Sequence, residues 1–255
     1  MSDAKTDDLK TGTFDTWVRI EQRRAADAVV QIKVDDKAAT RQAIIAALRR
    51  EGVTFLSRSD WKAKPSQRSD GPDWNFHAIA LHHAGNSYSC SADGADQLRK
   101  AEATDIASFG HVSYHYAIAC DGMLYEALDI REKGAHIASG NTGVIGIVML
   151  ADMSLPGEAY REEYAKKSLL GKVRGAVEWG ADELSSSPSR PSETQVKSLT
   201  ALVKVLRRYF TIDTLGGHRE FQQIQTGDGR ACPGAYGMEL VDRLRAELRI
   251  GAPKK

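Results

Sequence analysis

Two histidines and one cysteine are the residues whose types could build a catalytic metal site in this chain. His82 ends an apolar run typical of a strand, His218 follows a pair of glycines, and Cys232 precedes Pro233. Two imidazoles and one thiolate are ligands that a catalytic zinc ion takes, with the fourth position left open. Zinc lowers the pKa of a bound water to about 7, so such a site would supply hydroxide at neutral pH.

Each of these residues has a simpler explanation when it is taken alone. A histidine at a strand end is commonly a polar surface group, and a free cysteine is commonly a small buried hydrophobe. Spacing does not decide, because the chain has neither a Cys-x-x-Cys nor a His-Glu-x-x-His motif. A structural zinc site closed by a fourth ligand, such as His115 or His136, is a further alternative.

Eight short motifs around these residues favour the catalytic interpretation by their order. They are SRSDW (57–61), LHHA (81–84), VSYHY (112–116), CDGMLYE (120–126), GAH (134–136), GNTGVIGI (140–147), GHRE (217–220) and ACPG (231–234). Together they resemble the zinc-dependent N-acetylmuramoyl-L-alanine amidases, the family of phage amidase lysozymes and peptidoglycan recognition proteins. The resemblance covers residues 56–248, and the ordered set is far more specific than any single motif.

Carried over residue by residue, the resemblance implies a zinc ion held by His82, His218 and Cys232. It makes Tyr114 the catalytic tyrosine, which would hold the attacking water or donate to the oxyanion. Arg230 falls where the family has lysine or threonine near the reacting carbonyl. A guanidinium there would stabilise charge, because it does not transfer protons at neutral pH.

Three further residues are candidates for substrate binding. His136 and Asn141 match family positions near the substrate groove, with a structural hydrogen bond and a turn cap as their alternatives. His83 follows the ligand His82, and we expect it to point to the opposite face of the strand.

Two features depart from the family pattern. Fourteen positions separate His218 from Cys232, and the polar stretch 221–229 between them is expected to be a loop. The cytosolic recycling branch of the family carries a glutamate after the Gly-Ile of its central strand, whereas Val148 occupies that place here. Val148 therefore counts against a recycling enzyme.

The elements that position these residues are predicted from hydrophobic periodicity. Strands are expected at 78–83 and 144–150 and near 215, with a hairpin within 112–126. Helices are expected at 37–51, 91–107, 158–184, 193–210 and 238–248, the fourth opened by a capping box at Ser192 and Gln195. Residues 14–31 are expected to be helical, or helical and then a strand at 28–32. The fold class is thus α/β, a mixed central sheet flanked by helices, with a short helical N-terminal extension (1–54) before the amidase domain (55–250).

Composition narrows the function classes further. The 255 residues are 42% hydrophobic and 27% charged, as in a soluble globular protein. The 35 basic and 34 acidic side chains nearly cancel, which argues against nucleic acid as a partner. No apolar run reaches the roughly 18 residues of a membrane span, so we expect a protein that is not embedded in a membrane.

The N-terminus and the cysteines suggest where the chain is made. The first eight residues are polar and lack the apolar core of a secretory signal. We expect a reduced chain synthesised in the cytoplasm that reaches the cell wall by release or by separate delivery machinery. Cys90 and Cys120 are interpreted as inert, Cys90 because it lacks the nearby partner seen in secreted relatives.

The resemblance implies a zinc amidase whose partner is bacterial peptidoglycan, with a monomer as the family's default state. It would cleave the amide bond between N-acetylmuramic acid and L-alanine, as a phage-type endolysin or a delivered wall-degrading toxin. The alternatives are a cytosolic muropeptide-recycling amidase and a non-catalytic peptidoglycan-binding protein. Relatives that only bind characteristically lose the cysteine ligand, so Cys232 favours catalysis.

Overall fold

The computed structural model describes residues 16–22, 29–85, 88–156, 158, 190–227 and 229–254. Residues 1–47 and 48–255 form two compact units, a division that falls ahead of the boundary expected after residue 54. Within the described ranges, no helix is both long enough and apolar enough to cross a bilayer.

The first unit contains a β-hairpin in place of the helix expected at its start. β1 (Thr16–Gln22) pairs antiparallel with β2 (Val29–Asp35), and α1 (Asp36–Arg50) follows directly. The prediction of a helix over the residues of β1 was wrong. Val18 and Ile20 alternate there with charged residues, which is the two-residue period of a strand. The strand at 28–32, one of the two alternatives for this segment, and the helix expected at 37–51 are confirmed.

The second unit is built on a mixed six-stranded sheet, which confirms the predicted fold class. Its strand order is β3-β6-β5-β7-β4-β8. β4, β5, β7 and β8 run parallel to one another, and β5 and β6 form the expected antiparallel hairpin. All six residues of β7 are buried, as predicted for a central strand. The strands are β3 (Phe55–Leu56), β4 (Ala78–His83), β5 (Tyr116–Ile118), β6 (Leu124–Glu126), β7 (Val144–Met149) and β8 (Thr214–Gly217).

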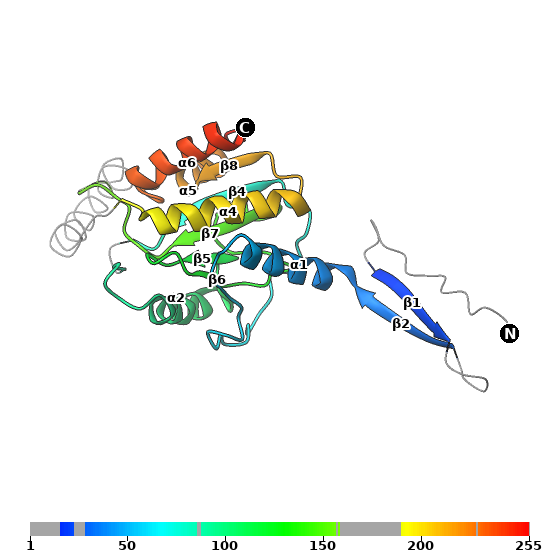
Figure 1. The fold of residues 1–255 in the computed structure, drawn as a ribbon. Helices are drawn as coiled ribbons and strands as arrows, with labels where there is room; N and C mark the ends of the chain where they lie inside the picture. Colours follow the sequence, from blue (N-terminus) through cyan, green and yellow to red (C-terminus); the bar gives the residue numbers. More distant parts are fainter. Residues whose placement is uncertain are drawn as a thin grey trace. The chain divides into compact units, whose positions relative to one another are not determined.

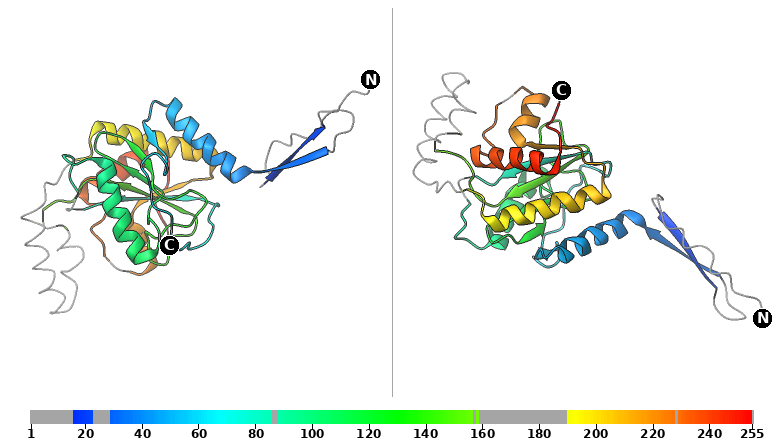
Figure 2. Two further views of the ribbon diagram at one scale, coloured as in Figure 1. Left: turned by 90° about the horizontal axis from the view of Figure 1, so that it is seen from below. Right: turned by 45° about the horizontal axis from the view of Figure 1, so that its top comes forward.

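Helices cover both faces of this sheet. α2 (Gly94–Phe109) lies along one face, and α4 (Glu193–Tyr209) and α6 (Ala235–Leu248) lie along the other (Figures 1 and 2). On the α2 face, Leu98 packs in one buried cluster with Ala117 of β5 and Val148 of β7. The expected helix at 158–184 lies outside the described residues, apart from Glu158.

The start of α4 follows the sequence prediction closely. The Ser192 hydroxyl accepts a hydrogen bond from the Gln195 backbone N–H, and the Gln195 side chain accepts one from the Ser192 N–H. The capping box is therefore confirmed, and it satisfies two backbone donors that the first turn of a helix leaves without partners.

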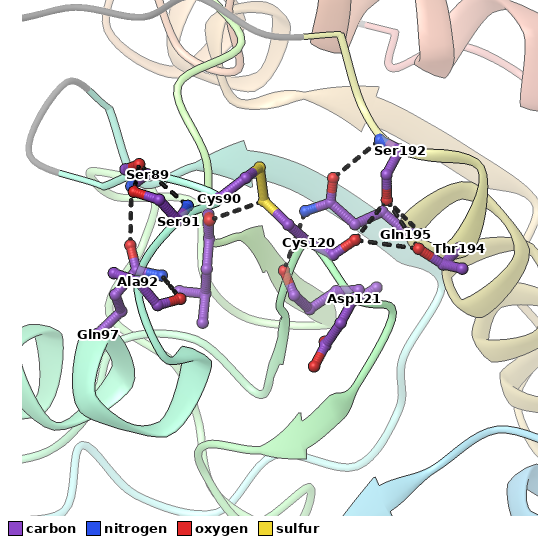
Figure 3. Close-up of a disulfide and its surroundings, with 12 residues drawn as sticks. Ser89, Cys90, Ser91, Ala92, Gln97, Cys120, Asp121, Ser192, Thr194 and Gln195 are labelled. Atoms are coloured by element: carbon purple, nitrogen blue, oxygen red, sulfur yellow. Dashed lines mark hydrogen bonds between the residues drawn. A yellow bond between two sulfur atoms is a disulfide. The ribbon is translucent and has the colours of Figure 1, made fainter.

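A disulfide joins Cys90 to Cys120, which corrects the interpretation of these cysteines as inert (Figure 3). The turn after β5 brings Cys120 to the segment between β4 and α2, and the two Cα atoms are 5.2 Å apart. The same turn is held from the other side, since Ser192 and Thr194 both donate side-chain hydrogen bonds to the Cys120 carbonyl. Cys90 thus finds its partner 30 positions away in sequence, across the fold.

Candidate metal centre

The three predicted ligands lie together at the carboxyl ends of neighbouring parallel strands. His82 is near the end of β4, His218 directly follows β8 as the first residue of α5 (His218–Gln225), and Cys232 lies in the turn before α6. One ligand atom of each residue lies within 4.8 Å of the others, and His82 Nδ1 is 3.6 Å from Cys232 Sγ. Because β4 and β8 are parallel and adjacent, their ends meet at one sheet edge, where α/β proteins commonly bind ligands.

A glycine lets the cysteine turn approach the histidine. A Cβ atom built on Gly217 would lie 2.7 Å from Cδ of Pro233, closer than real contacts allow. The Arg219 N–H then donates to the Cys232 carbonyl over 2.9 Å, which ties the first turn of α5 to the cysteine turn. The polar stretch 221–229 was predicted to be a loop. Its first five residues, 221–225, belong instead to helix α5, so the prediction was wrong for them.

The electrostatics of the cluster favour neutral imidazoles. Burial is the main cause that holds the pKa of His82 well below its ordinary value, and nearby His218 adds to the effect. Burial, followed by the positive charge of Arg230, lowers the pKa of His218 to about 4. A neutral ring keeps the lone pair that a metal ion requires.

Tyr114 lies beside the predicted ligands. Its ring centroid is 4.9 Å from that of His82, and the residue packs against the buried cluster on the α2 face. Burial, together with the charge of Cys232, raises its pKa above the ordinary value. The phenol therefore keeps its proton at neutral pH and can act as a hydrogen-bond donor.

His136 and Asn141 form one hydrogen-bonded group behind His82. His136 Nδ1 is 3.1 Å from His82 Nε2, and His136 Nε2 is 3.3 Å from the Val144 carbonyl oxygen. The Asn141 side-chain oxygen accepts from the backbone N–H groups of His136 and Ile137, each over 2.8 Å. Burial is the main reason that the pKa of His136 falls well below its ordinary value.

The remaining two candidates lie outside this group. His83 Nδ1 accepts a hydrogen bond from the Met153 N–H over 3.1 Å and lies 3.5 Å from a carboxylate oxygen of Asp152. Arg230 is exposed on the turn that leads to Cys232, and its charge reaches the site through its effect on His218.

Two residues that shape the site were missed in the sequence. The buried Glu158 carboxylate forms an ion pair with Arg219 and accepts the backbone N–H of Ala235, at the start of α6. Arg219 in turn donates to the Ala231 carbonyl beside Cys232. Arg219 stands next to His218 in the GHRE motif, which could have pointed to it, whereas Glu158 is 60 positions away and carries no local signal.

The model of the family described as N-acetylmuramoyl-L-alanine amidase matches residues 72–235. Peptidoglycan-recognition protein SC2 of Drosophila melanogaster is 29% identical over 131 residues, which make up 49% of this chain and 71% of that protein. The solved structure of Drosophila peptidoglycan recognition protein SD superposes with a TM-score of 0.53 at 17% identity, over 75% of this chain and 94% of the other. N-acetylmuramoyl-L-alanine amidase LysC from Clostridium intestinale gives a TM-score of 0.51 at 16% identity, over 77% of this chain and 98% of the other.

Proposed function

Because this chain belongs to the N-acetylmuramoyl-L-alanine amidase family, we propose that it is a zinc-dependent amidase acting on bacterial peptidoglycan. It cleaves the amide bond between N-acetylmuramic acid and the L-alanine of the stem peptide. The observation that carries this proposal is the convergence of His82, His218 and Cys232 within 4.8 Å.

The donor set fits a catalytic zinc ion. Two imidazole nitrogens and one thiolate are ligands that zinc prefers, and within the described residues no fourth histidine, cysteine or acidic side chain joins this group. Bound zinc supplies Lewis acidity, which acidifies water and polarises a carbonyl oxygen. The three-ligand group therefore supports a catalytic site over the structural site closed by His115 or His136.

Two side chains complete the proposed chemistry. The protonated Tyr114 phenol, beside His82, donates a hydrogen bond to the carbonyl oxygen as negative charge develops on it. Arg230 binds the substrate near the same oxygen and contributes a fixed positive charge, because a guanidinium stays protonated. Both groups act most strongly on the transition state, where the oxygen carries the most charge.

The second candidate function is peptidoglycan binding without catalysis. It is favoured by the names of relatives such as peptidoglycan-recognition protein SC2. Against it stands Cys232, which is present and within reach of His82 Nδ1. A binder has no need of a thiolate at this position, so we place the enzyme first.

The setting of the reaction is proposed from the disulfide and from Val148. Disulfides persist in oxidising compartments, so the Cys90–Cys120 bond supports action outside the cytoplasm, as for a released endolysin or a delivered toxin. Val148 pairs with His82 in the β4–β7 register and is buried, so an apolar side chain occupies the place of the recycling branch's glutamate. Both features count against cytosolic recycling.

The test compares intact sacculi with soluble muropeptides, using the wild-type chain and Cys232→Ser. The wild type should release peptide from sacculi faster than from soluble fragments, and Cys232→Ser should bind sacculi while releasing at least 100-fold less. Equal binding with no release by either protein would support the binding function. Preference of the wild type for soluble fragments would support recycling.

A further inference from the structure

His136 is a buried histidine with protein partners at both ring nitrogens. Its Nδ1 faces His82 Nε2 at 3.1 Å, and its Nε2 faces the Val144 carbonyl oxygen at 3.3 Å. It is 6% exposed, so neither nitrogen is presented openly to solvent. These contacts are typical of a side chain that holds a neighbouring residue in place, and not of one that binds substrate.

The chemistry of these contacts assigns the protons. The Val144 carbonyl can only accept, so His136 Nε2 carries the hydrogen and Nδ1 of the neutral ring carries the lone pair. His82 Nε2 must then donate to His136 Nδ1. The remaining nitrogen of His82, Nδ1, is left with its lone pair directed at the side where Cys232 Sγ lies 3.6 Å away.

Two glycines make the slot that holds the His136 ring. A Cβ atom on Gly146 would lie 2.6 Å from Cδ2 of His136, and a Cβ atom on Gly134 would lie 2.7 Å from the same carbon. The Asn141 side-chain oxygen accepts a hydrogen bond from the backbone N–H of His136 and so holds the His136 backbone in place. The glycine inside the otherwise apolar strand β7 is thereby explained, because a larger residue would displace the ring.

We propose that His136 is a positioning residue that fixes the tautomer and orientation of His82, so that His82 offers Nδ1 to the metal. This inference rests on the zinc site proposed above. Hydrogen-bond partners of metal-binding histidines typically contribute a factor of about 10–100 to metal affinity. The effect of His136 should therefore appear in zinc binding itself, separately from turnover.

Zinc affinity of the full chain, measured by competition with a chromogenic chelator, tests this role with two variants. In His136→Asn the side-chain oxygen stands near the place of Nδ1 and preserves the acceptor, whereas His136→Leu keeps bulk without one. We expect His136→Leu to weaken zinc binding about 10–100-fold and to alter the absorption spectrum of the cobalt-substituted protein. His136→Asn should stay within about three-fold of the wild type. Wild-type affinity in a folded His136→Leu, or equal losses in both variants, would overturn the proposal.

A measurement on the wild type keeps the test independent of how the variants fold. Nitrogen-15 spectra of the histidine side chains in the zinc-free protein should show the hydrogen on Nε2 in both His82 and His136. A hydrogen on Nδ1 of His82 would overturn the inference. If the wild type bound no zinc at all while the tautomers were as expected, the proposed function would fail and the internal hydrogen bond would stand.

Discussion

At the scale of single residues, the proposed roles of His82 and Tyr114 depend on side chains that are held against their neighbours. His82 is almost fully buried, with one nitrogen toward His136 and the other toward Cys232. Tyr114 is partly buried beside His82, with the two ring centroids 4.9 Å apart. Groups held in this way are aligned before substrate arrives, which is the usual source of their effect on rate.

The first prediction concerns Tyr114→Phe. Removing the hydroxyl removes one donor to the developing oxyanion, so kcat should fall by a factor of about 100–1,000, while bound zinc stays stoichiometric. Tyr209→Phe, at the end of α4, is the matched control and should retain full activity. Steady-state kinetics and metal analysis of both variants check this, and wild-type kcat in Tyr114→Phe would exclude the proposed role.

At the scale of elements, the site depends on the contacts among α5, the cysteine turn and α6. Glu158 joins them: it pairs with Arg219 of α5 and accepts the Ala235 N–H at the start of α6. A carboxylate at a helix N-terminus is also favoured by the helix dipole. The positions of His218 and Cys232 therefore depend on a residue that contributes no ligand atom.

The second prediction is that Glu158→Ala destabilises the protein by about 2–4 kcal/mol, because it leaves Arg219 without its buried partner. Zinc affinity should fall as well, since His218 and the cysteine turn lose their common anchor. Glu239→Ala, which breaks the exposed Arg190–Glu239 pair, should cost less than about 1 kcal/mol. Urea denaturation of both variants measures the difference, and equal free energies of unfolding would contradict it.

The elements that could be predicted are those whose signals are local. The capping box at Ser192, the apolar strand β7 and the helix stop at Gly52, with φ of +77°, follow from a few adjacent residues. Helix α5 was missed because its cap is a glycine without a side chain, although Glu220 three residues later completes a capping pattern. Strand β1 was missed, and β2 was predicted too short. In both, the alternation extends over only seven residues, so the same segment could also be interpreted as a helix.

The parts of the site that could not be predicted are those that depend on tertiary contacts. The order of the motifs sufficed to choose His82, His218 and Cys232, which the structure brings together. Glu158 and the pairing of Cys90 with Cys120 depend on which loops meet in space, and nothing near them in sequence indicates this. The same holds for His136, whose partners become visible only in the folded chain.

At the scale of the whole molecule, the second unit combines a buried sheet with one covalent link between loops. The disulfide closes a stretch of 30 positions that includes α2 and β5. Four buried or largely buried histidines with lowered pKa values lie in the same unit: His82, His115, His136 and His218. Redox state and pH should therefore both change its stability.

The third prediction is that reduction of the disulfide lowers the free energy of unfolding by about 2–4 kcal/mol, as expected for a loop of this length. Urea titrations with and without reductant measure this in the wild type. A Cys90→Ser/Cys120→Ser variant is the control. Its urea midpoint should equal that of the reduced wild type and should not change when reductant is added. Identical midpoints for oxidised and reduced wild type would contradict the prediction.

The fourth prediction concerns the acid side of the stability profile. Burial lowers the pKa of His115 to about 4, despite opposing effects of the Glu132 carbonyl and of Asp73 and Asp129. Protonation would also break the hydrogen bond that its Nδ1 accepts from the Gly146 N–H. The unfolded chain takes up this proton near pH 6.5 and the folded chain does not, so stability is complete above that pH and falls as pH drops toward 4.

The magnitude for His115 is roughly 3 kcal/mol by pH 4. Urea titrations of the zinc-free protein between pH 7.5 and 4.5 measure the loss, and His115→Gln should show a shallower slope than the wild type. Equal slopes in the two proteins would show that His115 is not the group responsible.

Purified Gram-negative sacculi offer the sharpest test of whether the protein is a zinc amidase with one bond specificity. The protein is incubated with them as isolated, after chelation, and after zinc is restored, and newly exposed L-alanine amino termini are counted in each case. The proposed function predicts that these termini appear with the protein as isolated, are lost with the chelator and return with zinc. A zinc-loaded protein that exposes no L-alanine termini, or that releases only sugar ends or other amino acids, would contradict it.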